Sequence, residues 1–544
     1  MCNASHASGA HAVERSDYSA LVGRAEKPPH PLRGLVTAIA SMLSMIFVGV
    51  CWFFYWFSAI PAAITALAIP RSVLERHPLF WLSSASIGLA CLTQTIDTFF
   101  PNYLNPREVL CEVAVWFGIG FLARTYLAYT QIPDTFDGVR AAIASRKIDR
   151  WFESVLPNSI DAIFTRIWVG NSIVILPLFV LLIVPSTSNY FVVLAYSALL
   201  LLSQFPYEIT DHVNIHNRIF NPKPAASDAT RRTLKACQVY FDKVLPLLSA
   251  RVPDYYRIQH VYVHHVEENG PDDTQSTMPY DRKSFLDFAR HAFWQGLELV
   301  SGFAVIPYLR RRKKDRQLRE FKRGLAIWYA FVIAVTIINP IAGVLIYVSR
   351  FFGGNILTLV AFFQHGVIDA NDVHAVHGNT LDYAGPEHGS LGDDYHVEHH
   401  LKPARHWSRY HEDFQKESAS EGGPRALTLD KEPFTPIAFV GALWRRDFST
   451  VARYAKIKVA DGDTANVEEL VKKRTRPIGD VERSGWAARV DGATSSVMAW
   501  MMLTSFHSCG LSRVPAATAL DKAATFAGSL WQSLRQSRMR GVAQ

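Results

Sequence analysis

Histidine is the residue type in this sequence whose number and spacing could do chemistry, because 15 of the 20 histidines lie between His212 and His411. Eight of these fall in three short clusters with the spacings HxxxH, HxxxHH and HxxHH. At this histidine frequency a given triple should arise by chance only about 0.03 times in the whole chain, whereas a given pair is uninformative. The clusters comprise His212 and His216, then His260, His264 and His265, and finally His396, His399 and His400.

Clustered imidazoles of this kind indicate metal binding. Imidazole is a ligand suited to iron, zinc, copper or nickel. Spacings of three and four residues place side chains on one face of a helix, so we expect each cluster to direct its imidazoles toward a common point. Eight histidines exceed the four ligands of a structural zinc site and the six of an octahedral ion. The sequence therefore predicts two metal ions.

The positions of other residues in the sequence predict a ninth ligand and a set of carboxylates that support the ligands. His365 ends the last apolar run, 31 residues before His396, so it is predicted to reach the same site. Neutral imidazoles leave the charge of the metals uncompensated, and carboxylates are expected to hold their ring N–H groups. The predicted partners are Glu208, Asp211, Asp394 and Glu398.

Other polar residues near the clusters are not predicted to bind the metals. Asp272 and Asp273 follow Pro271 and are interpreted as a turn. Five further histidines of this region are expected to form hydrogen bonds or lie at the surface. They are His374, His377, His388, His406 and His411.

Long uncharged runs must position the clusters. The 544 residues are 49% hydrophobic and only 19% charged, and the charges are concentrated between the apolar runs. A spanning helix needs roughly 20 residues. We therefore expect an all-α fold: a polytopic helical membrane protein with about six spans, within a range of four to seven, and a cytoplasmic helical cap that carries the di-metal histidine site. The uncharged runs are 34–70, 78–96, 167–207, 324–349 and 351–368, and 113–132 is a weaker candidate.

The longest runs also suggest where the chain turns. The run 167–207 is predicted to form a hairpin of two spans that turns at 185–189, a Pro-Ser-Thr-Ser-Asn segment. The run 34–70 contains Pro61 and is either one span with an interfacial piece or two short spans.

Charge predicts the orientation. Nine cations lie in 310–323, immediately before an apolar run, which is typical of a membrane-flanking anchor rather than of a nucleic-acid interface. The excess of Lys and Arg places the histidine clusters on the cytoplasmic side of an integral membrane protein, with no nucleic acid as partner. The predicted organisation is a polar N-terminal tail over 1–33, a membrane-embedded domain over 34–424 and a polar cytoplasmic C-terminal extension over 425–544.

Several classes of protein fit less well. The six cysteines form no CxxC pair, so no disulfide framework and no cysteine site for zinc or iron–sulfur is indicated. A haem-binding electron carrier or a divalent-metal transporter would place its ligands inside the spans, whereas these clusters lie outside the apolar runs. Because no HPGG or GxGxxG motif is present, electrons for any redox chemistry must come from a separate protein.

The order and spacing of the clusters resemble the histidine boxes of the membrane di-iron oxygenase superfamily, which includes fatty acid desaturases and alkane hydroxylases. The segment 363–369, FQHGVID, looks like the histidine-bearing end of that family's last span. The segment 394–407 is similar to the third box of bacterial acyl-lipid desaturase-like members. HxxxHH is more typical of alkane hydroxylases and HxxHH of many desaturases. Ala361 stands where some desaturases carry an Asn.

The resemblance implies an oxidation of lipid chains. It implies two Fe ions held by the nine histidines, O2 as co-substrate, and an acyl or alkyl chain that enters from the surrounding membrane lipids. The implied electron donor is an external carrier such as ferredoxin or rubredoxin with its reductase, for which the basic stretch 310–323 is a candidate docking site. The implied reaction is acyl-lipid desaturation. The alternative is hydroxylation of an alkane, a fatty acid or another lipid, and oxidation of a carotenoid or sterol is a further possibility.

Overall fold

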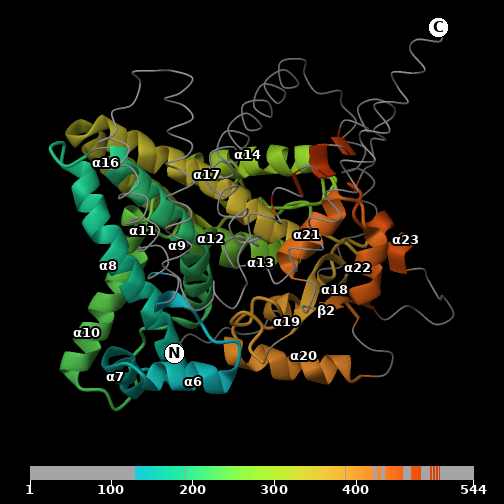
Figure 1. Cartoon of the computed structure of the whole chain (residues 1–544), viewed down its shortest axis with the longest axis horizontal. Helices are drawn as coiled ribbons and strands as arrows, with labels where there is room; N and C mark the ends of the chain where they lie inside the picture. The colour runs from blue at the N-terminus through green and yellow to red at the C-terminus, as the bar shows by residue number, and fades with distance from the viewer. Residues whose placement is uncertain are drawn as a thin grey trace, which may run out of the picture.

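The described part of the protein is predominantly helical, as predicted (Figure 1). The structure is a computed structural model that describes residues 126, 129–188, 190–385, 387–420, 425–430, 435–457 and 467–478, and parts of 491–502. The predicted runs 34–70 and 78–96 and most of 113–132 lie outside the described residues.

Within that part, three helical segments are long and apolar enough to cross a membrane. The first joins η1 (Ser159–Ile163) to α8 (Phe164–Ile183), and the others are α16 (Asp315–Ile338) and α17 (Pro340–Gln364). Helix α8 packs against α9 (Tyr190–Asn217), and the two form the predicted hairpin. His212 and His216 lie near the end of α9, and His365 directly follows α17.

The connection between α16 and α17 lies elsewhere than the uncharged runs suggested. Those runs are divided at Arg350, but the helices break at Asn339, eleven residues earlier. Proline fits the first position of a helix, and the Asn339 side chain accepts a hydrogen bond of 3.1 Å from the Ile341 amide. Arg350 therefore lies inside α17, where it is buried.

Helix α14 (Phe285–Ser301) packs along α17 at a close crossing made possible by glycine. A Cβ atom at Gly354 would lie 2.4 Å from the backbone nitrogen of Gly296 and 2.7 Å from the carbonyl oxygen of Ala292. Helix α14 begins after Ser284, whose side chain accepts a hydrogen bond from the Asp287 amide. The crossing fixes α14 beside the helix that leads to His365.

The remaining helices of the described residues are short and surround the histidine clusters and the C-terminal segment. They are α6 (Phe136–Ala144), α7 (Lys147–Val155), α10 (Asp228–Val239), η2 (Tyr240–Val244), α11 (Leu245–Leu248), α12 (Tyr255–Gln259), η3 (His260–His264), α13 (His265–Glu267), α15 (Val305–Arg311), α18 (Val376–Asn379), α19 (His396–Leu401), η4 (Trp407–Arg409), α20 (Tyr410–Ser418), α21 (Pro436–Trp444), α22 (Phe448–Tyr454) and α23 (Val467–Arg474).

A small sheet that the all-α prediction omitted lies next to the last two histidine segments. Strand β1 (Leu381–Ala384) pairs in parallel with β2 (Leu427–Asp430), which pairs antiparallel with β3 (Ala455–Lys456). Strands of four residues or fewer are too short for their alternation to be recognised in a sequence. Because β1 lies between His365 and His396, the sheet ties the chain after residue 425 to the site.

The C-terminal segment also contributes to the core. The Trp444 ring lies 5.1 Å from the rings of both Phe285 and Phe288, and Phe439 is fully buried. The guanidinium of Arg282 is buried and donates to the carbonyl oxygens of Arg474 and Arg476. Part of the stretch predicted as a polar extension therefore packs against α14 and the chain just before it.

Candidate metal centre

The nine predicted histidine ligands come together in two groups, although they are spread over almost 190 residues of sequence. In each group, one ring nitrogen from every histidine lies within 4.8 Å of those from the others. We call the five-histidine group site A and the four-histidine group site B. Site A comprises His212, His216, His260, His265 and His399, and site B comprises His264, His365, His396 and His400.

The second histidine cluster is divided between the two sites, which differs from the expectation that each cluster serves one point. Residues 260–264 form the π-helical turn η3, in which the His265 amide donates to the carbonyl oxygen of His260. This i to i+5 pairing brings positions 260 and 265 to one side, and their Nε2 atoms are 3.1 Å apart. His264 faces the other way, into site B.

The third cluster is divided in the same manner by an ordinary helical turn. His396 and His400 lie four residues apart on α19 and face site B, with their Nε2 atoms 3.2 Å apart. His399 lies between them in sequence and points toward site A, where its Nε2 is 2.8 Å from that of His265. One short helix thus serves both sites.

The other three ligands come from the ends of long helices. His212 and His216 are one turn apart near the end of α9, and both belong to site A. His365 directly follows α17, and its Nδ1 donates to the carbonyl oxygen of Asn379 at 2.9 Å. Its Nε2 therefore carries the lone pair and faces His396 Nε2 at 3.2 Å.

The arrangement of the donor atoms fits metal ions. Facing Nε2 atoms in both sites are 2.8 to 3.2 Å apart, so several lone pairs converge on each centre. His216 Nε2 is buried without a hydrogen-bond partner among the described residues. Two nitrogens bound to one ion at about 2.1 Å subtend about 90° when they are about 3.0 Å apart. These spacings match neighbouring ligands of a five- or six-coordinate ion.

Burial keeps the imidazoles in the form that binds metal. Burial, reinforced by the neighbouring histidines, lowers the pKa of His260, His265, His396, His399 and His400 well below the ordinary value. It lowers the pKa of His365 to about 3. These rings are therefore neutral near pH 7, and neutral imidazole is the ligand form.

Asp273, which was interpreted as part of a turn, supports a ligand. Its Oδ2 accepts a hydrogen bond of 2.6 Å from His264 Nδ1, and the amides of Asn269 and Gln275 hold the carboxylate at 3.0 and 2.9 Å. Burial alone would raise the pKa of Asp273, but His264 and these hydrogen bonds bring it below the ordinary value. Nothing in the periodicity of the sequence identifies this residue.

Two of the predicted carboxylate partners pair with cations instead of imidazoles. Glu208 forms an ion pair with Arg251, and Glu398 forms one with Lys402 at 3.0 Å. Burial raises the pKa of the Asp211 carboxyl, and Arg251 lies close enough for its guanidinium charge to oppose this effect.

Asp393, next to the predicted Asp394, also places a carboxylate beside a ligand. Asp393 Oδ1 is 3.3 Å from His212 Nδ1. Asp394 is buried, and its backbone oxygen accepts a hydrogen bond from the Tyr383 amide at 2.8 Å. The neighbouring position therefore orients a ligand of site A.

The basic stretch 310–323 touches the segment that carries the second cluster. Arg312 forms an ion pair of 2.8 Å with Glu267, and Lys314 Nζ donates to the carbonyl oxygen of Tyr262 at 2.8 Å. Arg310 and Lys313 are exposed. Positive charge thus lies on the surface next to His264 and His265.

Comparison with known proteins gives one match. Residues 228–425 match the family model described as "Fatty acid desaturase". The match contains the second and third clusters and His365, and it begins after His216, which the structure nevertheless brings into site A. No curated protein and no solved structure shows significant similarity to the chain.

Proposed function

Because residues 228–425 place this chain in the membrane fatty acid desaturase and hydroxylase superfamily, we propose that it is an O2-dependent fatty acyl desaturase with a two-iron centre. The observation that supports the proposal is the meeting of nine imidazoles, from every histidine cluster and the end of α17, in two adjacent groups. The family implies an oxidoreductase that acts on lipid chains. Insertion of a double bond is the specific reaction that we propose.

The chemistry explains why metal ligands dominate the site. A saturated carbon chain offers no acidic proton, carbonyl or leaving group, so side-chain acids, bases and nucleophiles cannot activate it. A pair of iron ions bound at the two sites would supply the redox chemistry that reduces O2 and oxidises a C–H bond. The protein's own residues would hold these ions with imidazole rings, most of which are buried.

Iron fits the donor set better than zinc. Site A offers five imidazoles, which exceeds the four ligands of a closed zinc site. The 2.8 to 3.2 Å spacing of the nitrogens suits angles near 90°, whereas tetrahedral ligands at the same bond length would be about 3.4 Å apart. Five- or six-coordinate iron is consistent with both features.

Electrons for O2 reduction must come from outside the chain. Removing two hydrogens from the substrate and reducing O2 to two waters also consumes two electrons and two protons. We infer that an acidic carrier of the ferredoxin or rubredoxin type, supplied by its reductase, docks on the basic stretch 310–323, because this stretch contacts the segment that bears His264 and His265. The excess of positive charge favours the cytoplasmic face for this encounter.

Hydroxylation is the second candidate, and a specific feature favours it. The second cluster has the HxxxHH spacing typical of alkane hydroxylases, and Ala361 stands at the position where some desaturases carry Asn. Both reactions would use the same ligands and the same electron supply. They differ in whether a second hydrogen is removed or an oxygen atom is inserted.

Lipid analysis distinguishes the two reactions. The chain is expressed with a ferredoxin or rubredoxin system, and the cell lipids are analysed by mass spectrometry. New double bonds support desaturation, and hydroxylated products select the alternative. His264→Ala and His396→Ala should each abolish the product while the protein still inserts in the membrane. His411→Ala is the control, because His411 bonds Tyr395 and Gln415 outside both sites. Full activity of either ligand variant would refute the metal assignment.

A further inference from the structure

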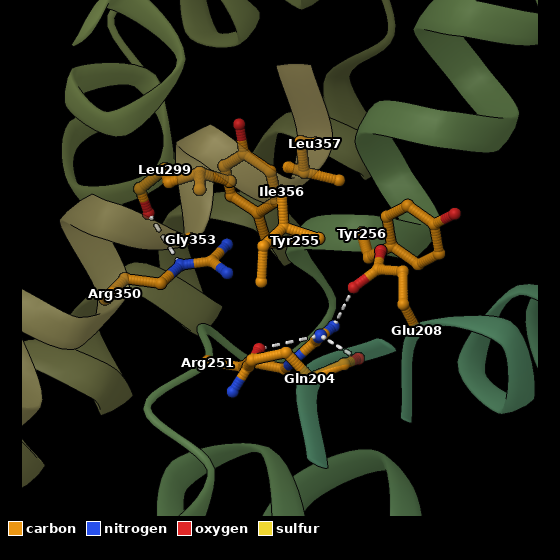
Figure 2. A pocket seen from close by; sticks show the side chains of 10 residues that line it. All are labelled: Gln204, Glu208, Arg251, Tyr255, Tyr256, Leu299, Arg350, Gly353, Ile356 and Leu357. Carbon is orange, nitrogen blue, oxygen red and sulfur yellow. Dashed lines mark hydrogen bonds and ion pairs between the residues drawn. The ribbon is translucent and has the colours of Figure 1, made fainter. Parts of the chain in front are cut away.

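A pocket with charged and apolar walls lies beside site A and is lined mainly by α9, α12, α14 and α17 (Figure 2). It encloses about 330 Å³ of space, including its open mouth. Its enclosed part holds little more than one water-sized group. Two arginines and one glutamate face it, together with apolar side chains such as Leu299 and Ile356. The pocket thus combines one net positive charge with apolar walls.

One of the two arginines is paired within the protein. Arg251 forms an ion pair with Glu208 and donates to Gln204 Oε1 at 2.9 Å. Its guanidinium also lies over the Tyr207 ring, 4.5 Å from the centroid. The charges of Arg251 and Glu208 therefore compensate each other.

The second arginine forms no ion pair with a carboxylate among the residues that the structure describes, although Glu208, Asp211 and Glu298 are near enough to interact with its charge. The Nε atom of Arg350 donates to the carbonyl oxygen of Leu299 at 3.1 Å, and its guanidinium lies 4.8 Å from the centroid of the Tyr255 ring. Its terminal nitrogens point into the pocket (Figure 2). Arg350 is only 8% exposed, and it lies inside the membrane-spanning helix α17. A buried charge in such a helix is costly unless an anion accompanies it, and it marks a functional site.

The pocket is close to the metal ligands. Glu208 precedes His212 by one turn of α9, and Tyr256 precedes His260 by one turn of the next ligand-bearing segment. The Tyr256 ring stacks on that of His260 with centroids 5.1 Å apart. The wall opposite Arg350 is therefore about one helical turn, or about 5.4 Å along the axis, from two ligands of site A.

We propose that this pocket binds the anionic head group of the lipid substrate, with Arg350 as the residue that pairs with its oxygens. This inference rests on the proposed lipid oxidation and adds the substrate class: a single-chain amphiphile whose head is a carboxylate or a phosphate. The space of about 330 Å³ up to and including the mouth has room for a carboxylate or a phosphate, and the apolar walls suit the first carbons of the chain. A planar carboxylate or a phosphate matches the paired N–H donors of arginine.

Anchoring at Arg350 has a consequence for the product. If the head group is fixed beside site A, the oxidised carbon is set by its distance from the head, not from the methyl end. Substrates of different length should then be oxidised at the same carbon counted from the head group.

Binding can be tested without turnover, which separates this inference from the proposed reaction. The full-length protein in neutral detergent is titrated with hexadecanoate, hexadecanol or a hexadecanoyl lysophosphatidic acid, and the midpoint of thermal unfolding is followed. We expect at least one of the two anionic probes to raise the midpoint and hexadecanol to have no effect. Hexadecanoate alone identifies a carboxylate, and the phospholipid alone identifies a phosphate. Equal effects of alcohol and acid, or no effect of either anion, would overturn the proposal.

Two variants assign the effect to the pocket. Arg350→Gln should weaken binding of the anionic probe at least tenfold, whereas Arg319→Gln on the exposed side of α16 should not change it. Gly353→Leu should block the pocket while keeping Arg350. The smaller Gly353→Ala places a methyl group only 3.5 Å from Leu299 Cδ1, in ordinary contact, and offers a variant that folds.

A purely structural role of Arg350 predicts a different result. If the arginine served only to bind the Leu299 carbonyl, Arg350→Gln would lower the unfolding midpoint without probe and leave binding unchanged, which would overturn the proposal. We expect the midpoint without probe to stay equal or rise, because a buried charge that forms no direct ion pair among the described residues has been removed. In the active protein, oxidation of C16 and C18 substrates at a constant distance from the methyl end would also contradict the inference. Binding without any oxidation would refute the proposed reaction alone.

Discussion

At the scale of single residues, the two sites consist entirely of imidazole side chains. Neither group includes a carboxylate among the residues that the structure describes. Carboxylates lie next to the ligands instead: Asp273 accepts a hydrogen bond from the His264 ring, and Asp393 lies near the His212 ring. Such partners fix the orientation of a ligand ring and raise its basicity.

Asp273 therefore should govern metal affinity at site B. We expect Asp273→Asn to weaken metal binding by about 10- to 100-fold, because the His264 ring loses its anchored, charged acceptor. Metal content after dialysis against a graded chelator measures the change. The neighbouring Asp272→Asn is the matched control, since Asp272 is 56% exposed and pairs with arginines of the basic stretch. Equal losses in both variants would contradict this role.

Glu298 on α14 predicts a dependence of stability on pH. Burial raises the pKa of Glu298 to about 7 from its ordinary 4.5, against the lowering effect of hydrogen bonds from the amides of Ala304 and Val305. Between these values the folded state keeps a proton that the unfolded state releases. Stability is therefore highest below about pH 4.5 and falls by about 3 kcal/mol as the pH rises to about 7.

Replacing this carboxyl should remove the effect. In Glu298→Gln, the part of the fall in unfolding free energy that this carboxyl causes between about pH 4.5 and 7 should disappear. The control is Glu469→Gln, at an exposed position of α23, which should keep the same dependence of unfolding free energy on pH as the unmodified protein. Denaturant titrations at a series of pH values provide the measurement. An unchanged slope in Glu298→Gln would show that the group is ionised in the folded protein.

At the scale of elements, the crossing of α14 and α17 determines where His365 lies. Gly354→Val should destabilise the protein by about 1–3 kcal/mol or more, because the added atoms meet the backbone of Gly296 and Ala292 rather than a movable side chain. The unfolding midpoint and the metal content should both fall. Gly353→Ala, one residue away, meets only Leu299 Cδ1 at 3.5 Å and should fold normally. Similar behaviour of the two variants would argue against a tight crossing.

The elements also show what a sequence pattern can and cannot predict. The run 167–207 predicts the α8–α9 hairpin because apolar length is a strong signal. Asn339 and Pro340 are typical of the start of a helix, and α17 does begin there. The uncharged runs nevertheless divide at Arg350, because a charged residue in the sequence marks a boundary between two apolar segments. The π-helical turn η3 has no sequence signature, so spacing predicted the ligands His260, His264 and His265 without predicting how they divide. Asp273 becomes a partner of His264 only through tertiary packing.

At the scale of the whole molecule, the ligands come from segments that share no local structure: the end of α9, the turn η3, the end of α17 and helix α19. Ions bound there join these segments. We expect removal of the metals by a chelator to lower the unfolding midpoint, because ligands that bind only the folded state stabilise it. Adding Fe(II) back should restore the midpoint, and a midpoint unaffected by chelation would contradict joint ligation by these segments.

The packing of the last described segments has a consequence for biosynthesis. The segment from His365 to His396 contacts chain that follows it in sequence. Its strand β1 pairs with β2, and its Ile368 amide donates a hydrogen bond to the carbonyl oxygen of Arg474. Trp444 packs nearby on Phe285. Chains are made from the N-terminus, and domains generally fold as units. We therefore expect the imidazoles to reach their final positions only after residues 427–476 have been made. Metal binding would then follow translation of this segment, and a chain that ends before residue 427 would bind metal weakly.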